Sequence, residues 1–413
     1  MLALDVINDL ELEQLDVKTA FLHGELDEQI YIKQPPGFVD KKYPEHACYL
    51  KKSLYGLKQS PRLWYKRFDS YVLKLGFVRS NYDPCFCYAS VDNCLVYMLL
   101  YVDDILLISK SVDKIKVLKS QLNSEFDMKD LRKATKLLGI FIDRDRSKCC
   151  LKLHQRPYLE KIVPKFSSLD CKPVQVPLAP HFILSKSQSP KSDIEFAKME
   201  NVPYANAIGS VMYAMISSRP DLSYVISLLS RFMSNSRPEH WLALKHVFVY
   251  IRSTLDVGLC YKKRRDDLKL IGYVDVDFGG DIDTRKSTTA LYFTLSACCV
   301  SWKSQLQSIV TISSTESEYI ALCDAVKEAM WLQGMLSEAK LFSGTAIVKC
   351  DSQSAICLSK NPVYHERSKH IDIKYHFVRD TIENGDVIVD KVGTEYNPAD
   401  MGTKTLTPSS SFA

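Results

Sequence analysis

The sequence lacks several features that would each have fixed a class of protein. No apolar run reaches the roughly 20 residues that a membrane-spanning helix needs, so we expect no membrane partner. The thirteen cysteines include no Cys-x-x-Cys pair with downstream ligands, which argues against a zinc site and a disulfide framework. The N-terminus shows no basic segment followed by an apolar core, so we expect no signal peptide. These absences favour an intracellular protein with reduced thiols.

Neither sign of charge dominates the sequence. The 413 residues carry 54 basic and 49 acidic side chains, a formal net charge of +5. This balance permits nucleic acid as a partner without indicating it, because any basic surface must come from local clustering. Hydrophobic residues make up 46% of the chain and charged residues 25%, which is an ordinary globular mixture long enough for two or three domains.

One pair of carboxylates stands out against this composition. Asp103 and Asp104 interrupt an apolar segment, with residues 94–100 before them and residues 105–108 after them. Each flanking run has the length of a buried strand, so the pattern predicts strand, tight turn and strand, with both aspartates at the turn. Charge beside buried strands is costly unless a partner such as a divalent metal ion compensates it. The alternative is a solvent-exposed Asp-Asp turn.

A third carboxylate, Asp16, follows a short strand-like stretch near the N-terminus. Together with Asp103 and Asp104, the runs 15–38 (LDVKTAFLHGELDEQIYIKQPPGF) and 53–65 (SLYGLKQSPRLWY) resemble the reverse transcriptase of copia-type LTR retrotransposons. The resemblance implies a polymerase palm in which the three aspartates hold two Mg²⁺ or Mn²⁺ ions for phosphoryl transfer. It also implies an RNA template, a DNA primer and a dNTP as partners.

The same resemblance suggests nucleotide and template contacts. Phe21 lies where the family places an aromatic steric gate against the ribose 2′-hydroxyl, although a core phenylalanine is the other interpretation. Gln59 resembles the glutamine of the nucleotide- and template-contacting motif. Its neighbours Lys58 and Arg62 would meet phosphates, and a solvated helix face explains these two charges as well. A basic fingers region precedes the Asp16 segment in the family, whereas only fifteen residues precede it here, so we expect most of the fingers to be missing.

Acidic residues recur in the second half of the chain at the ends of predicted strands and the starts of predicted helices. Ligands gathered at such places are typical of α/β active sites, while single acidic residues there usually act as caps or turns. Asp277 and Glu316 are rivals for the first two positions. The preferred set is Asp275, Glu318, Asp351 and Asp400.

This half resembles copia-type ribonuclease H. The resemblance implies hydrolysis of the RNA strand of an RNA–DNA hybrid, with two metal ions held by the four preferred carboxylates. The family usually has glycines or an aromatic residue where this chain has Ala290, Ser296, Ala297, Cys298, Cys299 and Phe278. The matching runs are 272–288, 313–322, 350–356, 369–378 and 397–404.

The predicted architecture is α/β (α+β). It comprises a palm and thumb with an antiparallel sheet and helices over residues 1–166, a linker and helical connection over 167–267, and a ribonuclease H-like mixed α/β domain over 268–413. The resemblance implies an RNA-directed DNA polymerase fragment with ribonuclease H activity, other polyprotein products as partners, and a cytoplasmic virus-like particle as location. The alternative is a decayed or domesticated remnant that binds nucleic acid without catalysis.

Overall fold

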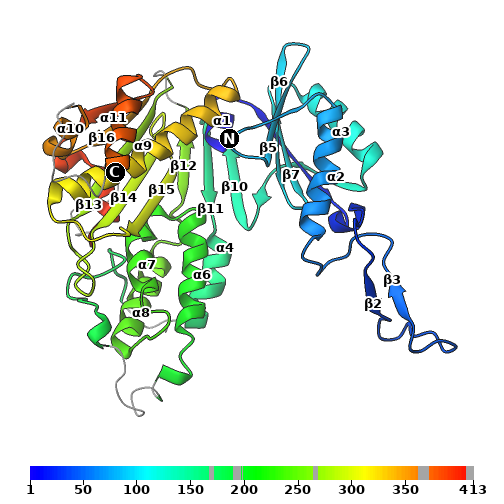
Figure 1. Ribbon diagram of the computed structural model, residues 1–413, viewed down its shortest axis with the longest axis horizontal. Coiled ribbons are helices and arrows are strands. Elements are labelled where there is room, and N and C mark those ends of the chain that lie inside the picture. The colour runs from blue at the N-terminus through cyan, green and yellow to red at the C-terminus, as the bar shows by residue number, and fades with distance from the viewer. Residues whose placement is uncertain (167–171, 189–196, 198, 264–267, 361–371, 406–413) are drawn as a thin grey trace. The chain divides into compact units, whose positions relative to one another are not determined.

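The computed structural model describes residues 1–166, 172–188, 197, 199–263, 268–360 and 372–405 (Figure 1). The chain divides into two compact units, which are Asn8–Thr135 and the combination of Met1–Ile7 with Lys136–Ala413. This division lies upstream of the boundary expected at residue 166, because residues 136–166 pair and pack within the larger unit. In the described ranges no helix has the length and apolarity that a membrane span requires.

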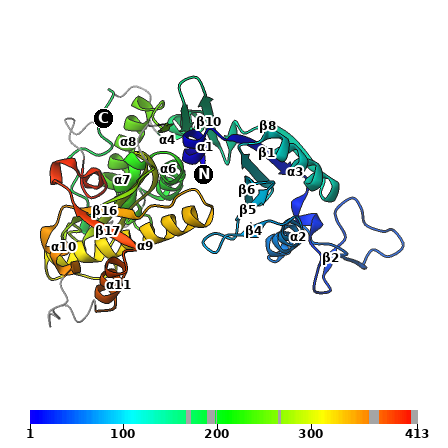
Figure 2. The ribbon, with the colours of Figure 1, turned by 90° about the horizontal axis from the view of Figure 1, so that it is seen from above.

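The Asn8–Thr135 unit is built on an antiparallel sheet of six strands in the order β4-β5-β6-β7-β1-β8. Alternation along β1 turns Leu15 and Val17 into the core and places Gln14 and Asp16 on the opposite face. A separate two-stranded arm, β2 with β3, projects from the rest of this unit (Figure 1 and Figure 2). The strands are β1 Glu11–Val17, β2 Tyr31–Lys33, β3 Ala47–Tyr49, β4 Val78–Arg79, β5 Phe86–Val91, β6 Cys94–Tyr101, β7 Asp104–Ser109 and β8 Met128–Lys133.

The two α-helices α2 and α3 belong to this unit. A proline in its first turn suits the start of α2, and the Ser111 side chain caps α3 by accepting a hydrogen bond from the backbone N–H of Lys114. Trp64 and Phe68 of α2 pack against Phe126, with ring centroids 5.3 and 5.7 Å from its ring. The helices are η1 Ala20–His23, α2 Ser60–Lys74 and α3 Val112–Glu125.

The larger unit begins with a four-stranded sheet, in the order β12-β11-β10-β9, and a helical cluster. Helices α4, α6, α7 and α8 share one apolar core. Within the expected linker and helical connection, 167–267, helices α6, α7 and α8 are followed by a strand, β12, which pairs with β11. The elements are α1 Leu2–Asn8, β9 Lys136–Leu137, β10 Ile140–Asp145, β11 Cys150–His154, α4 Arg156–Phe166, η2 Lys186–Gln188, α6 Tyr204–Ser217, η3 Pro220–Leu222, α7 Ser223–Ser230, α8 Pro238–Ser253 and β12 Leu259–Lys262.

The last part of the chain forms a ribonuclease H-like mixed α/β arrangement. Its sheet has the order β15-β14-β13-β16-β17, with β13, β16 and β17 parallel and the remaining pairs antiparallel. The long helix α9 packs along this sheet beside α10 and α11 (Figure 1). The elements are β13 Leu270–Asp277, β14 Thr288–Leu295, β15 Cys298–Leu306, α9 Ser314–Glu338, β16 Ala346–Cys350, α10 Gln353–Lys360, α11 Asp372–Glu383, β17 Val387–Lys391, η5 Thr394–Tyr396 and η6 Pro398–Gly402.

The β5–β6 hairpin and the β14–β15 hairpin each have a turn in which both central residues adopt positive φ. Asp92 and Asn93 join β5 to β6 with φ of 47° and 59°, and Ser296 and Ala297 join β14 to β15 with φ of 49° and 61°. Such turns match the twist of the strands but favour Asn, Asp and Gly. The first hairpin therefore has suitable residues, whereas the second holds serine and alanine in the left-handed region.

Candidate active sites

The first acidic group lies at the end of the β6–β7 hairpin, beside β1. Asp16 of β1 is directly opposite Asp104 of β7 in the antiparallel register, so their side chains lie on the same face of the sheet. The backbone N–H of Val17 donates to the carbonyl of Asp103 at 2.9 Å, which holds the turn against β1. The predicted strand–turn–strand is confirmed, with one difference: Asp103 occupies the turn, whereas Asp104 is the first residue of β7.

The turn between the two strands has its own support. Val102 adopts a φ of 56°, an uncommon conformation for a β-branched residue. The indole N–H of Trp64, a buried side chain on α2, donates to the Val102 carbonyl at 2.6 Å. The core helix thus fixes the backbone that carries Asp103.

Electrostatics also couple the three aspartates. Desolvation raises the pKa of Asp104, a hydrogen bond from the Gln14 amide opposes this shift, and the charges of Asp103 and Asp16 raise the pKa further. The Gln14 Nε2 atom lies 2.8 Å from Asp104 Oδ1. Sequence reasoning missed Gln14, although its place two residues before Asp16 on a strand would have put it on the same face.

The suggested nucleotide and template residues lie on the segment that follows β1. Phe21 is half-buried on η1, and its ring centroid is 4.7 Å from that of Tyr55, so it has both core and exposed neighbours. Gln59 is the N-cap residue of α2, but its side chain makes no capping hydrogen bond. Lys58 and Arg62 are exposed on either side of it. Their roles stay predictions.

The second acidic group is assembled on parallel strands of the ribonuclease H-like sheet. Val274 of β13 is opposite Cys350 of β16, so the next residues, Asp275 and Asp351, stand at the same level on neighbouring strands. Asp275 lies toward the carboxyl end of β13, and Asp351 directly follows β16, where ligand sites of α/β sheets are found. The third member, Glu318, is in the second turn of α9, which packs on β13 and β16.

Glu318 is the most strongly perturbed member of this group. Burial and then the charges of Asp351 and Asp275 raise the pKa of Glu318 to about 8, and Lys391 acts in the opposite direction. Its Oε2 atom is buried without a hydrogen-bond partner. One ligand atom each of Glu318, Cys350 and Asp351 lie within 4.8 Å of one another. A bound cation would offset the repulsion among these carboxylates and would give Glu318 Oε2 a partner.

Asp275 is also buried, and the charges of two other carboxylates in the group act on it. Desolvation raises its pKa to about 6; the charges of Asp351 and Asp400 also raise it, whereas a hydrogen bond from Thr403 lowers it. The Thr403 hydroxyl donates to Asp275 Oδ2. The Thr394 hydroxyl likewise donates to Asp351 Oδ2 at 2.8 Å. Neither threonine was foreseen, because each contact joins segments far apart in the sequence.

Asp400 reaches the group from the short helix η6. Asn397 caps this helix, which is of the 3₁₀ type, because its Oδ1 accepts from the backbone N–H of Ala399 at 3.2 Å. The Asn397 amide also donates to the carbonyl of Val274 at 2.9 Å, which fixes η6 to β13. Lys404 Nζ lies 2.5 Å from Asp400 Oδ1 and balances its charge.

The two rival carboxylates have other partners. Glu316 is buried, and its Oε2 accepts from the backbone N–H of Ile312 at 2.8 Å at the start of α9. The pKa of Asp277 is raised by burial and lowered by Arg231 and Lys404. Neither residue is among the charges that shift Asp275 or Glu318. Electrostatic interactions link Asp275, Glu318, Asp351 and Asp400, and the preference for them over Asp277 and Glu316 stays a prediction.

Part of the basic run 369–378 lies outside the described residues. Within α11, Arg379 is buried, and its guanidinium lies 4.0 Å from the centroid of the Tyr375 ring. That side chain is therefore used in packing.

Comparison with known proteins identifies the family. Residues 1–180 match the model of reverse transcriptase (RNA-dependent DNA polymerase). A putative transposon Ty5-1 protein of Saccharomyces cerevisiae is 33% identical over 316 residues, which cover 76% of this chain and all of that protein. The chain belongs to the copia-type retrotransposon Pol family. Within it, residues 1–180 correspond to the reverse transcriptase region.

Longer relatives extend the match over nearly all of this Pol chain. The retrovirus-related Pol polyprotein from transposon TNT 1-94 of Nicotiana tabacum is 46% identical over 98% of the chain, and that from transposon RE2 of Arabidopsis thaliana is 37% identical over 96%. The chain spans 30% and 26% of their respective lengths. Among solved structures, an LC11-RNase H1 in complex with an RNA/DNA hybrid covers 32% of this chain and 91% of its own, with 19% identity and a TM-score of 0.24.

Proposed function

We propose that the ribonuclease H-like part of this Pol chain hydrolyses the RNA strand of RNA–DNA hybrids by metal-assisted phosphoryl transfer. The observation that supports this most is the placement of its carboxylates, because Asp275 and Asp351 follow paired residues of β13 and β16, and one oxygen of Glu318 lies within 4.8 Å of one of Asp351. Glu318 responds to Asp351 and Asp275, and Asp275 responds to Asp351 and Asp400. Such like-charge clusters at the end of a sheet are costly without a cation and are characteristic of functional sites.

The donor set fits Mg²⁺ or Mn²⁺, two per site. Carboxylate oxygens are the ligands that hard cations prefer, and the buried, unpartnered Glu318 Oε2 offers one directly. Asp275, Asp351 and Asp400 would complete the set. When bound, the cations would neutralise charge on the scissile phosphate and lower the pKa of the attacking water.

The chain's own residues prepare this chemistry by orientation. Thr403 holds Asp275, and Thr394 holds Asp351, so each carboxylate is left with one oxygen that its threonine does not occupy. Lys404 forms an ion pair with Asp400, and its positive charge would limit repulsion between the cluster and a phosphate backbone.

We propose nucleotidyl transfer as the function of the first acidic group. The in-register pair of Asp16 and Asp104, with Asp103 in the turn beside them, supports binding of two divalent cations by a polymerase palm. Phe21 would face the sugar of an incoming dNTP. Gln59, Lys58 and Arg62 would contact the nucleotide, the RNA template and the DNA primer.

The test uses the full chain with a labelled RNA–DNA hybrid and Mg²⁺. We expect cleavage of the RNA strand, preferred over duplex RNA and duplex DNA. Asp351→Asn should lower the rate at least about a hundredfold, as expected for a group acting in the transition state. The matched control is Asp390→Asn, an exposed aspartate on the neighbouring strand β17, which should cleave like the wild type.

The outcomes separate the competing interpretations. Unchanged cleavage by D351N would reject the site. Binding of the hybrid without turnover, at any Mg²⁺ or Mn²⁺ concentration, would favour a non-catalytic remnant of a retrotransposon. Equal cleavage of all three duplexes would support a metal-dependent nuclease with a different substrate preference.

A further inference from the structure

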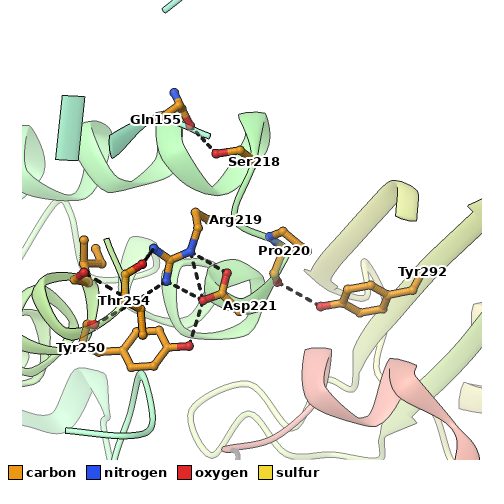
Figure 3. Close-up of polar contacts among 9 residues, drawn as sticks. Gln155, Ser218, Arg219, Pro220, Asp221, Tyr250, Thr254 and Tyr292 are labelled. Atoms are coloured by element: carbon orange, nitrogen blue, oxygen red, sulfur yellow. Dashed lines mark hydrogen bonds and ion pairs between the residues drawn. The ribbon is translucent and has the colours of Figure 1, made fainter. Parts of the chain in front are cut away.

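A buried ion pair locks the turn between α6 and α7 (Figure 3). The Arg219 guanidinium is fully buried and donates to both carboxylate oxygens of Asp221, from Nε at 2.9 Å to Oδ1 and from Nη2 at 2.7 Å to Oδ2. It also donates to the carbonyl of Thr254 at 3.1 Å and to its hydroxyl at 2.8 Å, and the Tyr250 hydroxyl donates to Asp221 at 2.9 Å. Neither proposed active site uses this network.

The peptide between the two charged residues connects the network to the ribonuclease H-like sheet. Tyr292, a buried residue of β14, donates to the carbonyl of Pro220 at 3.2 Å (Figure 3). Its oxygen lies 2.6 Å from the hydroxyl of Ser223, at the start of α7. Because a phenol has one proton, the Ser223 hydroxyl donates to Tyr292 when Tyr292 donates to Pro220. A single side chain thus joins the sheet to two residues of the helical segment.

The ring of Tyr292 also supports the helix that carries Asp400. A Cβ built on Gly402 of η6 would stand 2.6 Å from Ala290 Cβ and 2.9 Å from Tyr292 Cε2, so the backbone of η6 rests directly on β14. Tyr292, Ala290 and Ala399 form one buried cluster. By register, Asp275 is opposite Ala290, two residues from Tyr292 on the same face of the sheet.

We infer that Tyr292 is a positioning residue through which the helical segment α6–α8 sets the place of η6, and hence of Asp400 and Thr403, in the acidic site. The Arg219–Asp221 pair holds the backbone at Pro220 in place. The Pro220 carbonyl accepts a hydrogen bond from the Tyr292 hydroxyl, and the Tyr292 ring packs against the backbone of η6. Thr403 then meets Asp275. The inference rests on the proposed function for its catalytic consequence, but the structural link can be measured without activity.

The test compares Tyr292→Phe with Tyr204→Phe in the full chain. Both changes remove one buried hydroxyl that donates to a backbone carbonyl, since Tyr204 donates to Leu229 at 2.9 Å within the helical core. Y292F keeps the ring under η6 but loses the tie to Pro220 and Ser223. We expect about threefold to tenfold faster amide exchange over residues 397–403 in Y292F and no change there in Y204F.

Catalysis gives the second readout. The Mg²⁺ concentration for half-maximal hybrid cleavage should rise about threefold to tenfold in Y292F and stay at the wild-type value in Y204F. Ser223→Ala should shift the exchange of residues 397–403 in the same direction as Y292F, and adding it to Y292F should cause little further change, because the two hydroxyls act on one link.

Three results would decide the matter. Equal exchange over residues 397–403 in Y292F, Y204F and the wild type would overturn the inference. So would a loss of maximal rate in Y292F with unchanged Mg²⁺ dependence, because that would indicate a general loss of structure. A wild-type chain that does not cleave hybrids would reject the proposed function and leave the exchange experiment as the test of the link.

Discussion

Ionisation of Glu318 should make the stability of the metal-free protein fall as the pH rises. Its pKa is raised from 4.5 to about 8 by burial and by the charges of Asp351 and Asp275. The folded protein therefore keeps a proton there that the unfolded chain has lost, and each difference of one in pKa is worth about 1.36 kcal/mol. The favourable contribution is complete below about pH 4.5 and disappears as the pH passes about 8.

The substitution Glu318→Gln removes this dependence, because the amide imitates the neutral acid. In EDTA, E318Q and the wild type should have similar free energies of unfolding at pH 4.5. The difference should grow to about 3 kcal/mol at pH 7 and at most about 5 kcal/mol at pH 9, with E318Q the more stable. Urea unfolding at these three pH values measures it.

A control and a reversal sharpen the experiment. Glu316→Gln makes the same chemical change two residues earlier on α9, where the carboxylate accepts a backbone hydrogen bond from Ile312. The free energy of unfolding of E316Q should not change with pH in the way expected for E318Q. Mg²⁺ should stabilise the wild type more at pH 8 than at pH 6, because cation binding requires the deprotonated carboxylate. Parallel pH curves for E318Q and the wild type would refute the reasoning.

Three further changes probe other parts of the chain. Arg219→Met leaves the Asp221 charge buried without its partner, so urea unfolding should show a loss of about 3–5 kcal/mol; a loss below 1 kcal/mol would mean that the pair is dispensable. Trp64→Phe removes the hydrogen bond to the Val102 carbonyl and should lower the free energy of unfolding by about 1–2 kcal/mol. The sulfurs of Cys150 and Cys260 lie 3.3 Å apart on β11 and β12, so a mild thiol oxidant should link these two cysteines first, as peptide mass mapping would show.

Local structure was predictable where the pattern itself is local. The apolar runs before and after Asp103 and Asp104 predicted the strands β6 and β7 correctly. In each case the forces that select the conformation act between residues a few positions apart, so the sequence displays them directly.

Pairing between strands that are far apart in the chain could not be predicted from the sequence. Residues 259–262 read as the end of a helical region and form β12, because β11 supplies a partner more than a hundred positions earlier. The compact units divide at residue 135 for the same reason, whereas the boundary was expected at residue 166. Strand pairing depends on the neighbouring strand, which a local stretch of sequence does not show.

The acidic site shows the same limit. The positions of Asp275 and Asp351 at strand ends could be read from the chain, but the hydroxyls that hold them, from Thr403 and Thr394, could not. The proximity of the Cys350 thiol to Glu318 was equally hidden, because it depends on how α9 lies on β16.

The turn between β14 and β15 holds Ser296 and Ala297 in a conformation that these residues disfavour, and this affects the surface on which η6 packs. Holding Ser296 and Ala297 at positive φ costs roughly 1–2 kcal/mol per residue, whereas the Asp92–Asn93 turn is built from residues that tolerate this conformation. The β14–β15 ribbon therefore takes its alignment from β13 rather than from its own bend. β14 carries Tyr292 and Ala290, on which η6 and its Asp400 rest, so pairing with β13 also determines the surface under Asp400. An Asn-Gly turn at 296–297 would let the β14–β15 hairpin align without that help.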